Sequence, residues 1–506
     1  MSTPEERVGG HVVGSDTREV VALRIRSFRV SEWLAAITVV LAILGMAFAA
    51  PPLVGPDETP HQATASYLTV HIMPPIAETQ AYVPGLLKFG DCTSFDSTKD
   101  ESCLPPREEA LSGFGRIFNY PPLYYWAVGL GQKAAPGADL WLDVGGRVAS
   151  TLITLIVLIA LALSARVRFP LWGSSLLAVT TPMAVFLWAV VNPNGWEISC
   201  GLLFAYALLV AWKPTQDVKT PRIPWWAQSI VVGVVAIIFG LSRHDALIWI
   251  ILLTAAVYFM STSRSLDRRR LTLLLAAALG VVAGLVWQWT HPALHPLHNP
   301  DYNANPTLLD RVHWFMQIDN VLPDHVRQMV GVLGSLDTPV PQILVVTFTL
   351  GWAATGGLLY ARQKVSALVV MIGFFGIFLL PWVLEFLRWN DWPYWWEGRY
   401  ALPFAIPFLF IFLLRYGAKG SRAVQALSLV SSFILLFMVW QTFMRYAYGV
   451  KDYIPVRWDN PAVGPVPYFG SIIIITLMSS LLVVRLIIFF SQALRERRAL
   501  QGVETS

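Results

Sequence analysis

Charged residues are scarce in this chain. Asp, Glu, Lys and Arg make up 14% of its 506 residues, whereas a soluble protein of this size carries about a quarter. Apolar residues make up 55%, and they gather in long continuous runs. Runs of roughly 18 or more apolar residues cross ~30 Å of hydrocarbon as helices, and only helices or closed barrels satisfy the backbone in lipid. Because the runs do not alternate, the sequence predicts an all-α polytopic integral membrane protein.

Motifs of soluble catalytic machinery are missing as well. The chain has no Walker A sequence, no G-x-G-x-x-G after a strand and no HExxH, which argues against ATP-driven transport by this chain alone. A soluble nucleotide-sugar domain is also missing. No cleavable signal peptide is apparent, because the first apolar run starts near Trp33 behind a polar tail and has the length of a span. We therefore predict a retained first helix.

About twelve membrane spans are predicted, and two tight hairpins leave eleven or thirteen as alternatives. The predicted spans cover residues 33–53, 146–165, 170–190, 196–212, 224–241, 245–261, 271–289, 341–361, 365–387, 400–414, 423–443 and 470–490.

Lys and Arg are unevenly distributed among the segments that connect these spans. With the N-terminus in the cytoplasm, cations outnumber acids in the inside segments and acids outnumber cations outside. Positively charged loops stay in the cytoplasm, so both termini are predicted to be cytoplasmic, in the inner or plasma membrane. The net charge of +5 is therefore a topology signal, and we expect no nucleic-acid partner.

The predicted domain organisation is a single transmembrane domain, 33–490, between two cytoplasmic tails, 1–32 and 491–506, that we expect to be disordered. The outside loops cover 54–145, 290–342, 388–399 and 444–469. The first loop contains a short apolar stretch, Pro121–Gly131, which predicts an interfacial or re-entrant helix with Tyr124, Tyr125 and Trp126 at headgroup level.

The three cysteines of the chain fall into two groups. Cys92 and Cys103 share the first outside loop, where a disulfide would stabilise the fold by about 2–3 kcal/mol; two free thiols are the alternative. Cys200 lies in a span and reads as a small buried hydrophobe.

An acidic pair, Asp57-Glu58, follows the first predicted span. Adjacent carboxylates at a membrane boundary can bind a divalent cation, or one can act as a general base while its neighbour holds position. If a helix begins near Thr59, His61 would lie close to Asp57. The alternative is a helix cap, in which Asp57 accepts backbone N–H bonds.

Two further groups of polar residues lie at the same side of the membrane. Trp396, Glu397, Arg399 and Tyr400 precede a span and suit a phosphate head group or a sugar face; an interfacial aromatic belt is the alternative. Arg243-His244-Asp245 lies at the tip of a hairpin, where charges are costly, and either serves a site or forms a self-contained turn.

Two other motifs have simpler explanations. His291, His295 and His298 have helical spacing, but Pro292 and Pro296 oppose a helix, so an ordinary loop is favoured over a metal site. Asn192-Pro-Asn194 reads as turn chemistry.

Four short motifs, taken together, carry a family resemblance. They are Pro56-Asp-Glu-x-x-His61 with Ala63 and Ala65 behind it, Asn119–Tyr125 with Gly146-Arg147 following, Asn192-Pro-Asn194, and Gly398-Arg-Tyr-x-x-Pro403. In this order the chain resembles the bacterial membrane proteins grouped as DUF2142, and more widely the GT-C superfamily of membrane glycosyltransferases.

The resemblance implies a GT-C-like fold and a transferase at the outer face that uses a polyprenyl-phosphate sugar as donor and an envelope glycan or glycolipid as acceptor. It implies that Asp57 is the general base of an inverting reaction and that Glu58 orients Asp57 or the acceptor, or shares a cation. Arg399 and Arg243 would neutralise the lipid phosphate, and the remaining substrate-binding candidates are His61, His244, Trp396, Glu397 and Tyr400. We predict no dedicated metal site, although a divalent cation between the two acids stays open.

Two other functions are weighed against this one. A transporter or flippase of a lipid-linked sugar should carry charges near the bilayer midplane. Here Glu197 and Glu385 lie near span ends and only Arg485 looks internal, which favours an enzyme at the boundary. A non-catalytic protein of envelope assembly is the third possibility.

Overall fold

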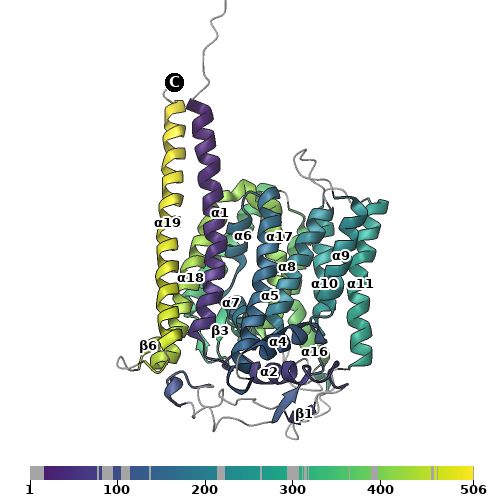
Figure 1. The fold of residues 1–506 in the computed structure, drawn as a ribbon. Helices are drawn as coiled ribbons and strands as arrows, with labels where there is room; N and C mark the ends of the chain where they lie inside the picture. Colours follow the sequence, from purple (N-terminus) through teal and green to yellow (C-terminus); the bar gives the residue numbers. More distant parts are fainter. Residues whose placement is uncertain are drawn as a thin grey trace, which may run out of the picture.

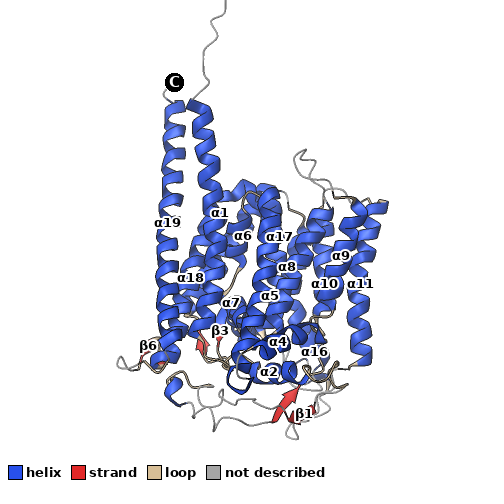
Figure 2. Cartoon of the chain, in the orientation of Figure 1, coloured by secondary structure: helices blue, strands red, loops and turns tan. Residues whose placement is uncertain are grey.

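The structure is a computed structural model, and it describes residues 16–76, 79–82, 95–103, 114–135, 138–212, 223–261, 265–292, 307–309, 312, 316, 318–363, 365–388, 397–456, 461–463 and 465–504. Within these ranges the chain is overwhelmingly helical, and the strands are three short antiparallel pairs (Figure 2).

Long helices run side by side in one bundle (Figure 1). They are α1 (Asp16–Ala49), α5 (Ala138–Arg168), α8 (Pro193–Trp212), α9 (Trp225–Gly240), α10 (Ala246–Met260), α11 (Arg268–Thr290), α14 (Gln342–Gln363), α15 (Ala367–Phe374) continued by the π-helical η2 (Phe375–Leu379) and α16 (Leu380–Arg388), α17 (Leu402–Tyr416), α18 (Ser421–Tyr448) and α19 (Pro465–Glu504). The short η4 (Gly417–Gly420) joins α17 to α18.

The predicted all-α class is confirmed, and each of the twelve predicted spans falls on one helix or on two or three consecutive helical elements. Among the described residues, eight segments are long and apolar enough to cross a membrane, or nine with one bent pair. One of these segments, Gly398–Tyr448, contains both α17 and α18, while α9 and α10 are apolar but shorter. The count of twelve therefore stays a prediction.

The third predicted span is broken in the middle, whereas the sequence predicts one continuous helix over 170–190. It consists of α6 (Trp172–Val179) and α7 (Pro182–Ala189), which meet at an angle of 91°. Pro182 has no N–H to continue α6, and a residue before proline avoids helical geometry. Thr181 then caps α7, since its side chain accepts a hydrogen bond from the N–H of Ala184 at 3.2 Å.

Short elements lie across one end of the bundle, which we call the capped end (Figure 1). They include α2 (Glu58–Tyr67), α4 (Pro122–Ala134) and the antiparallel pair β1 (Thr79–Tyr82) and β2 (Phe114–Ile117), in which Thr79 faces Ile117. The other short elements are η1 (Glu101–Cys103), α13 (Ile318–Gly331), η3 (Gly398–Ala401) and the pairs β3 (Val332–Leu333) with β4 (Thr338–Pro339) and β5 (Val450–Lys451) with β6 (Ile454–Pro455).

Helix α4 confirms the short helix predicted from Pro121–Gly131, but two of its three aromatic residues are not placed as predicted. Tyr124 and Tyr125 are buried, and Trp126 is 39% exposed. The hydroxyl of Tyr124 lies 2.9 Å from Oγ of Ser150, and that of Tyr125 bonds to His61. Because both hydroxyls find partners inside the protein, the two rings pack inward instead of lying at headgroup level.

The expectation of disordered tails is wrong for 16–32 and 491–504, because α1 begins at Asp16 and α19 continues to Glu504. These two helices pack along one another and extend beyond the rest of the bundle at the end opposite the capped end (Figure 1). Cys200 is a buried free thiol as predicted, whereas Cys92 lies outside the described residues and the Cys92–Cys103 disulfide stays a prediction.

Candidate active site

Glu58 is the buried anchor of helix α2. Its carboxylate accepts two hydrogen bonds from Arg147 of α5, from Nε at 2.6 Å and Nη2 at 2.5 Å. It also accepts from the backbone N–H groups of Gly55 at 3.0 Å and Val191 at 3.1 Å. Arg147 in turn donates to the carbonyl of Ala50, at the end of α1. Every oxygen of Glu58 is thus used to join α1, α2, α5 and the segment after α7.

Asp57 points the other way. Its backbone is left-handed, with φ 55° and ψ 20°, and although it stands at the start of α2 its side chain makes no capping hydrogen bond. The helix-cap alternative is therefore wrong. The side chain is 51% exposed, and its Oδ2 lies 3.0 Å from Nη2 of Arg399. A left-handed non-glycine residue costs of order 1 kcal/mol or more, so this backbone must be held by its surroundings.

Several charges determine the ionisation of Asp57. Burial acts to raise the pKa of its carboxyl group, but the positive charge of Arg399, supported by Arg116 and Arg243, outweighs burial and lowers the pKa below its ordinary value. Asp57 is consequently a carboxylate at neutral pH, able to accept a proton.

Arg399 lies in η3, just before α17. Nε of Arg399 lies 2.9 Å from Oε2 of Glu397, and Nη2 lies 3.4 Å from the hydroxyl of Tyr400 as well as contacting Asp57. The backbone N–H of Gly398 donates to Gln328 of α13 at 2.8 Å, which fixes η3 in place. Trp396, predicted to belong to this group, lies outside the described residues.

Arg243 reaches the same place from the loop between α9 and α10. Its Nη1 donates to Oδ1 of Asn194 and lies 3.9 Å from Glu197. The guanidinium group also stacks on the rings of Tyr120 and Tyr400, with distances of 5.5 and 4.7 Å to the ring centres. In the alternative explanation, a self-contained turn, Arg243 would be held by Asp245. The contact between them is only a 4.0 Å ion pair, so the turn does not account for the position of Arg243.

These side chains surround a cavity of about 150 Å³ at the capped end. Among the described residues, its lining holds three arginines and one carboxylate, that of Asp57. These lining residues are Asp57, His61, Arg116, Phe118, Tyr120, Asn192, Asn194, Arg243, Arg399 and Tyr400. A cavity with this charge suits an oxyanion, and its aromatic walls suit an apolar ring face.

His61 forms part of the aromatic wall. Its Nδ1 lies 2.9 Å from the hydroxyl of Tyr125, and its ring lies 4.8 Å from that of Phe118. Burial, opposed by Asp57 and reinforced by the arginines, lowers the pKa of His61 to about 3. His61 is therefore neutral at physiological pH.

Two of the predicted binding residues, Glu397 and His244, lie beside the cavity without lining it. His244 contacts the ring of Tyr120 at 5.3 Å, and its Nε2 lies 3.3 Å from the carbonyl of His291. His291 stacks on Trp287 at 3.9 Å, while His295 and His298 lie outside the described residues. Over the described part of the chain, no three His, Cys, Asp or Glu side chains are grouped to hold a metal ion.

The sequence prediction missed Arg116, Phe118 and Tyr120. They belong to β2 and the segment behind it, and Arg116 lies over the ring of Phe118 at 5.1 Å. Tyr120 is part of the Asn119–Tyr125 motif, which was the one available signal. Arg116 belongs to no recognisable sequence motif. It reaches the cavity only through the pairing of β2 with β1, a long-range contact that the local sequence does not show.

Fold and site define a polytopic helical membrane protein with a charged cavity at one end of the bundle. A family model described as "Predicted membrane protein (DUF2142)" matches residues 40–409, and the chain belongs to this family. No curated protein matches it. Among solved structures it is similar to ArnT from Cupriavidus metallidurans bound to undecaprenyl phosphate, with 15% identity, a TM-score of 0.43 and coverage of 94% of this chain and 73% of the other. The apo state of the same protein gives 13%, 0.41, 94% and 76%.

Proposed function

We propose that this protein is an inverting membrane glycosyltransferase that moves a sugar from a polyprenyl-phosphate donor to an envelope glycan or glycolipid acceptor. The observation that supports it most directly is the position of the Asp57 carboxylate, half exposed beside the guanidinium groups of Arg399 and Arg243 in one cavity. A base and an oxyanion site next to each other are the two parts that such a transfer requires.

The proposed reaction is a single displacement. A hydroxyl of the acceptor gives its proton to Asp57, and its oxygen attacks the anomeric carbon of the donor. The bond between that carbon and the phosphate oxygen breaks, and the bonding electrons leave with the phosphate. Arg399 and Arg243 stabilise the negative charge that builds up on the leaving phosphate, and one displacement inverts the anomeric configuration.

The proposal places the capped end at the outer face of the inner or plasma membrane, with both termini in the cytoplasm. The uneven distribution of Lys and Arg supports this orientation. It brings the cavity to the outer headgroup level, where the phosphate of a lipid donor lies. A donor with a polyprenyl chain then reaches the cavity without leaving the bilayer.

The role of Glu58 differs from the one that the resemblance implies, which is to orient Asp57 or the acceptor or to share a cation. We propose that it acts as an anchor for α2 and leaves the chemistry to Asp57, since all of its hydrogen bonds go to Arg147 and backbone groups.

Transport of a lipid-linked sugar is the second candidate function. It is favoured by one observation: Arg485, inside the last predicted span in α19, is 2% exposed, and ionisable residues inside a membrane often serve transport. Nη2 of Arg485 donates to Oγ of Ser428 at 2.7 Å, and its Nη1 donates to Oγ of Ser432. These local partners suit a structural role equally well.

Substitution of the proposed base tests the function. Asp57→Asn keeps the shape of the side chain and tolerates the left-handed backbone, but it cannot accept a proton. With purified protein and polyprenyl-phosphate sugar donors in liposomes, we expect the transfer rate to fall by about 10²–10⁴-fold. Mass spectrometry of lipids that co-purify with the wild type identifies the class of donor.

The chain offers a matched control for this substitution. Asp452 is also an exposed aspartate with a left-handed backbone, φ 50°, and does not line the cavity. Asp452→Asn should leave transfer unchanged. Full transfer by Asp57→Asn would exclude Asp57 as the base, and export of the intact lipid-linked sugar without transfer would favour the transporter.

A further inference from the structure

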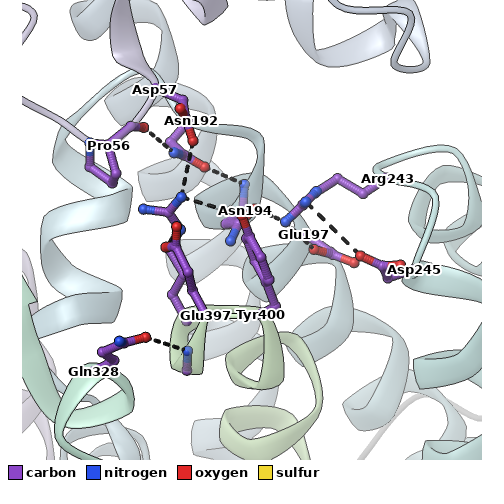
Figure 3. A network of polar contacts seen from close by, with 12 residues as sticks. Pro56, Asp57, Asn192, Asn194, Glu197, Arg243, Asp245, Gln328, Glu397 and Tyr400 are labelled. Atoms are coloured by element: carbon purple, nitrogen blue, oxygen red, sulfur yellow. Dashed lines mark hydrogen bonds and ion pairs between the residues drawn. The ribbon is translucent and has the colours of Figure 1, made fainter. Parts of the chain in front are cut away.

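The turn Asn192-Pro193-Asn194, which begins α8, holds two amide side chains whose orientation is fixed by their partners (Figure 3). Nδ2 of Asn192 donates to the carbonyl of Pro56 at 2.8 Å, and its Oδ1 accepts from the backbone N–H of Asn194 at 2.9 Å. A carbonyl only accepts and a backbone N–H only donates, so Asn192 has one possible orientation.

The orientation of the Asn194 amide is fixed in the same way. Its Oδ1 accepts a hydrogen bond from Nη1 of Arg243, and a guanidinium group can only donate. The amide nitrogen of Asn194 is therefore the atom that stays available for another partner.

That nitrogen has no hydrogen-bond partner among the described residues, although Asn194 is 2% exposed and lines the cavity. Nη1 of Arg399, another residue of the lining, is unpartnered and buried in the same way. A buried donor without a partner is costly, and most such groups in native proteins are paired. Two of them in the wall of one cavity indicate that a ligand supplies the acceptors.

We propose that Asn194 is a ligand-binding residue whose Nδ2 donates a hydrogen bond to one oxygen of an oxyanion, while Nη1 of Arg399 binds another oxygen of the same group. The inference rests on the proposed function and adds a residue to it. A tetrahedral phosphate fits because it presents several acceptor oxygens in different directions, and it can come from a lipid head group or from free phosphate.

A neutral donor is well suited to this position. Arg399 already faces the carboxylates of Asp57 and Glu397, and Arg243 faces those of Glu197 and Asp245. Part of the positive charge of both arginines is therefore compensated before a ligand enters. An amide donates a hydrogen bond to the ligand and, because it is neutral, needs no further carboxylate to balance its charge.

Asn194→Asp is the informative substitution. The carboxylate keeps the size of the side chain and an acceptor for Arg243, and it replaces the donor with a negatively charged acceptor. Binding of two probes, farnesyl phosphate and inorganic phosphate, is measured by calorimetry on the purified full-length protein in detergent, at low and high salt. We expect the affinity for the phosphate probe to fall at least about tenfold, which corresponds to about 1.4 kcal/mol, and the loss to persist at high salt.

Gln425→Glu is the matched control. Gln425 is a buried amide in α18 whose Nε2 also lacks a partner among the described residues, and it does not line the cavity. This variant should bind within twofold of the wild type. If Asn194→Asp does not fold, Asn194→Leu replaces it, with the same expected loss.

The outcomes separate the possibilities. Wild-type affinity in the Asn194 variant, a loss that disappears at high salt, or a wild type that binds neither probe would overturn the inference. Binding of farnesyl phosphate but not of inorganic phosphate identifies a lipid head group, and binding of inorganic phosphate at least as tight as that of farnesyl phosphate identifies free phosphate. A protein that binds phosphate through Asn194 but transfers no sugar contradicts only the proposed function. Transfer with an unaffected Asn194 variant contradicts only the inference.

Discussion

Two neighbouring carboxylates, Asp57 and Glu58, lie in opposite environments in this protein. Glu58 is 1% exposed and enclosed by Arg147 and backbone N–H groups, whereas the side chain of Asp57 is 51% exposed at the cavity. The left-handed backbone of Asp57 sends consecutive side chains in different directions. The proposed proton acceptor and the structural anchor therefore differ by one position in the chain.

The charge around Asp57 predicts the pH dependence of transfer. As the proposed base, Asp57 acts only when ionised, so we expect activity to be lost as the pH falls through its pKa. Burial alone would raise that pKa, while the positive charges of Arg399, Arg116 and Arg243 together lower it. In the pH profile of kcat/KM, we call the fall at low pH the acid limb. We expect its midpoint to lie below the ordinary pKa of an aspartate.

Arg399→Gln tests the cause of this shift. Without the guanidinium group, burial is opposed by less positive charge and the pKa of Asp57 rises. The acid limb should therefore move to higher pH, and the rate should fall. Lys99→Gln, at an exposed lysine in the first loop, should leave the limb in place. An unmoved limb in the Arg399 variant would contradict the assignment of the limb to Asp57.

At the scale of elements, the cavity depends on how short segments are joined. Helix α2 is tied to α5 by Glu58 and Arg147, and the segment after α7 is tied to the Pro56 carbonyl by Asn192. The break between α6 and α7 makes this possible, because α7 leaves the direction of α6 by 91° and ends beside α2. A straight third span, as the sequence predicts, would end elsewhere.

The Glu58–Arg147 pair should therefore be important for stability. Glu58→Gln leaves the buried charge of Arg147 without its carboxylate, and removing one partner of a buried ion pair costs about 3–5 kcal/mol. We expect a clearly lower midpoint of thermal unfolding in detergent. Lys99→Met, which removes one partner of an exposed ion pair with Asp96, should change the midpoint little. Equal midpoints for both variants would show that the pair does not anchor α2.

At the scale of the whole molecule, the bundle has two unlike ends. The capped end carries α2, α4, the strands and the cavity, and the opposite end carries the extensions of α1 and α19 (Figure 1). The proposed function requires that the capped end lie outside, since the lipid donor and the glycan acceptor meet there.

Cysteine labelling tests this orientation. Asp452 lies at the capped end and Arg497 near the end of α19, and both are exposed. With a maleimide that does not cross membranes, Asp452→Cys should be labelled on intact cells and Arg497→Cys only after permeabilisation. Chains with only the three native cysteines give the background. The reverse pattern would overturn the orientation and with it the proposed site.

The sequence by itself determined the class of the protein and the position of Asp57. Apolar runs of span length are a local property, so they are readable without knowing what packs against them. The same holds for Asp57, which is recognisable because it directly follows the first run beside two prolines. Arg399 and Arg243 stand out for the same reason, as charges beside apolar runs.

Only the tertiary structure decided which carboxylate serves the cavity and which residues complete it. Glu58 meets Arg147 across 89 residues of sequence, and Arg399 meets Asp57 across 342. Arg116 and Asn194 reach the cavity through a strand pairing and a guanidinium contact. No local pattern encodes such pairings, because the partners come together only when the bundle closes and buried polar groups must find one another.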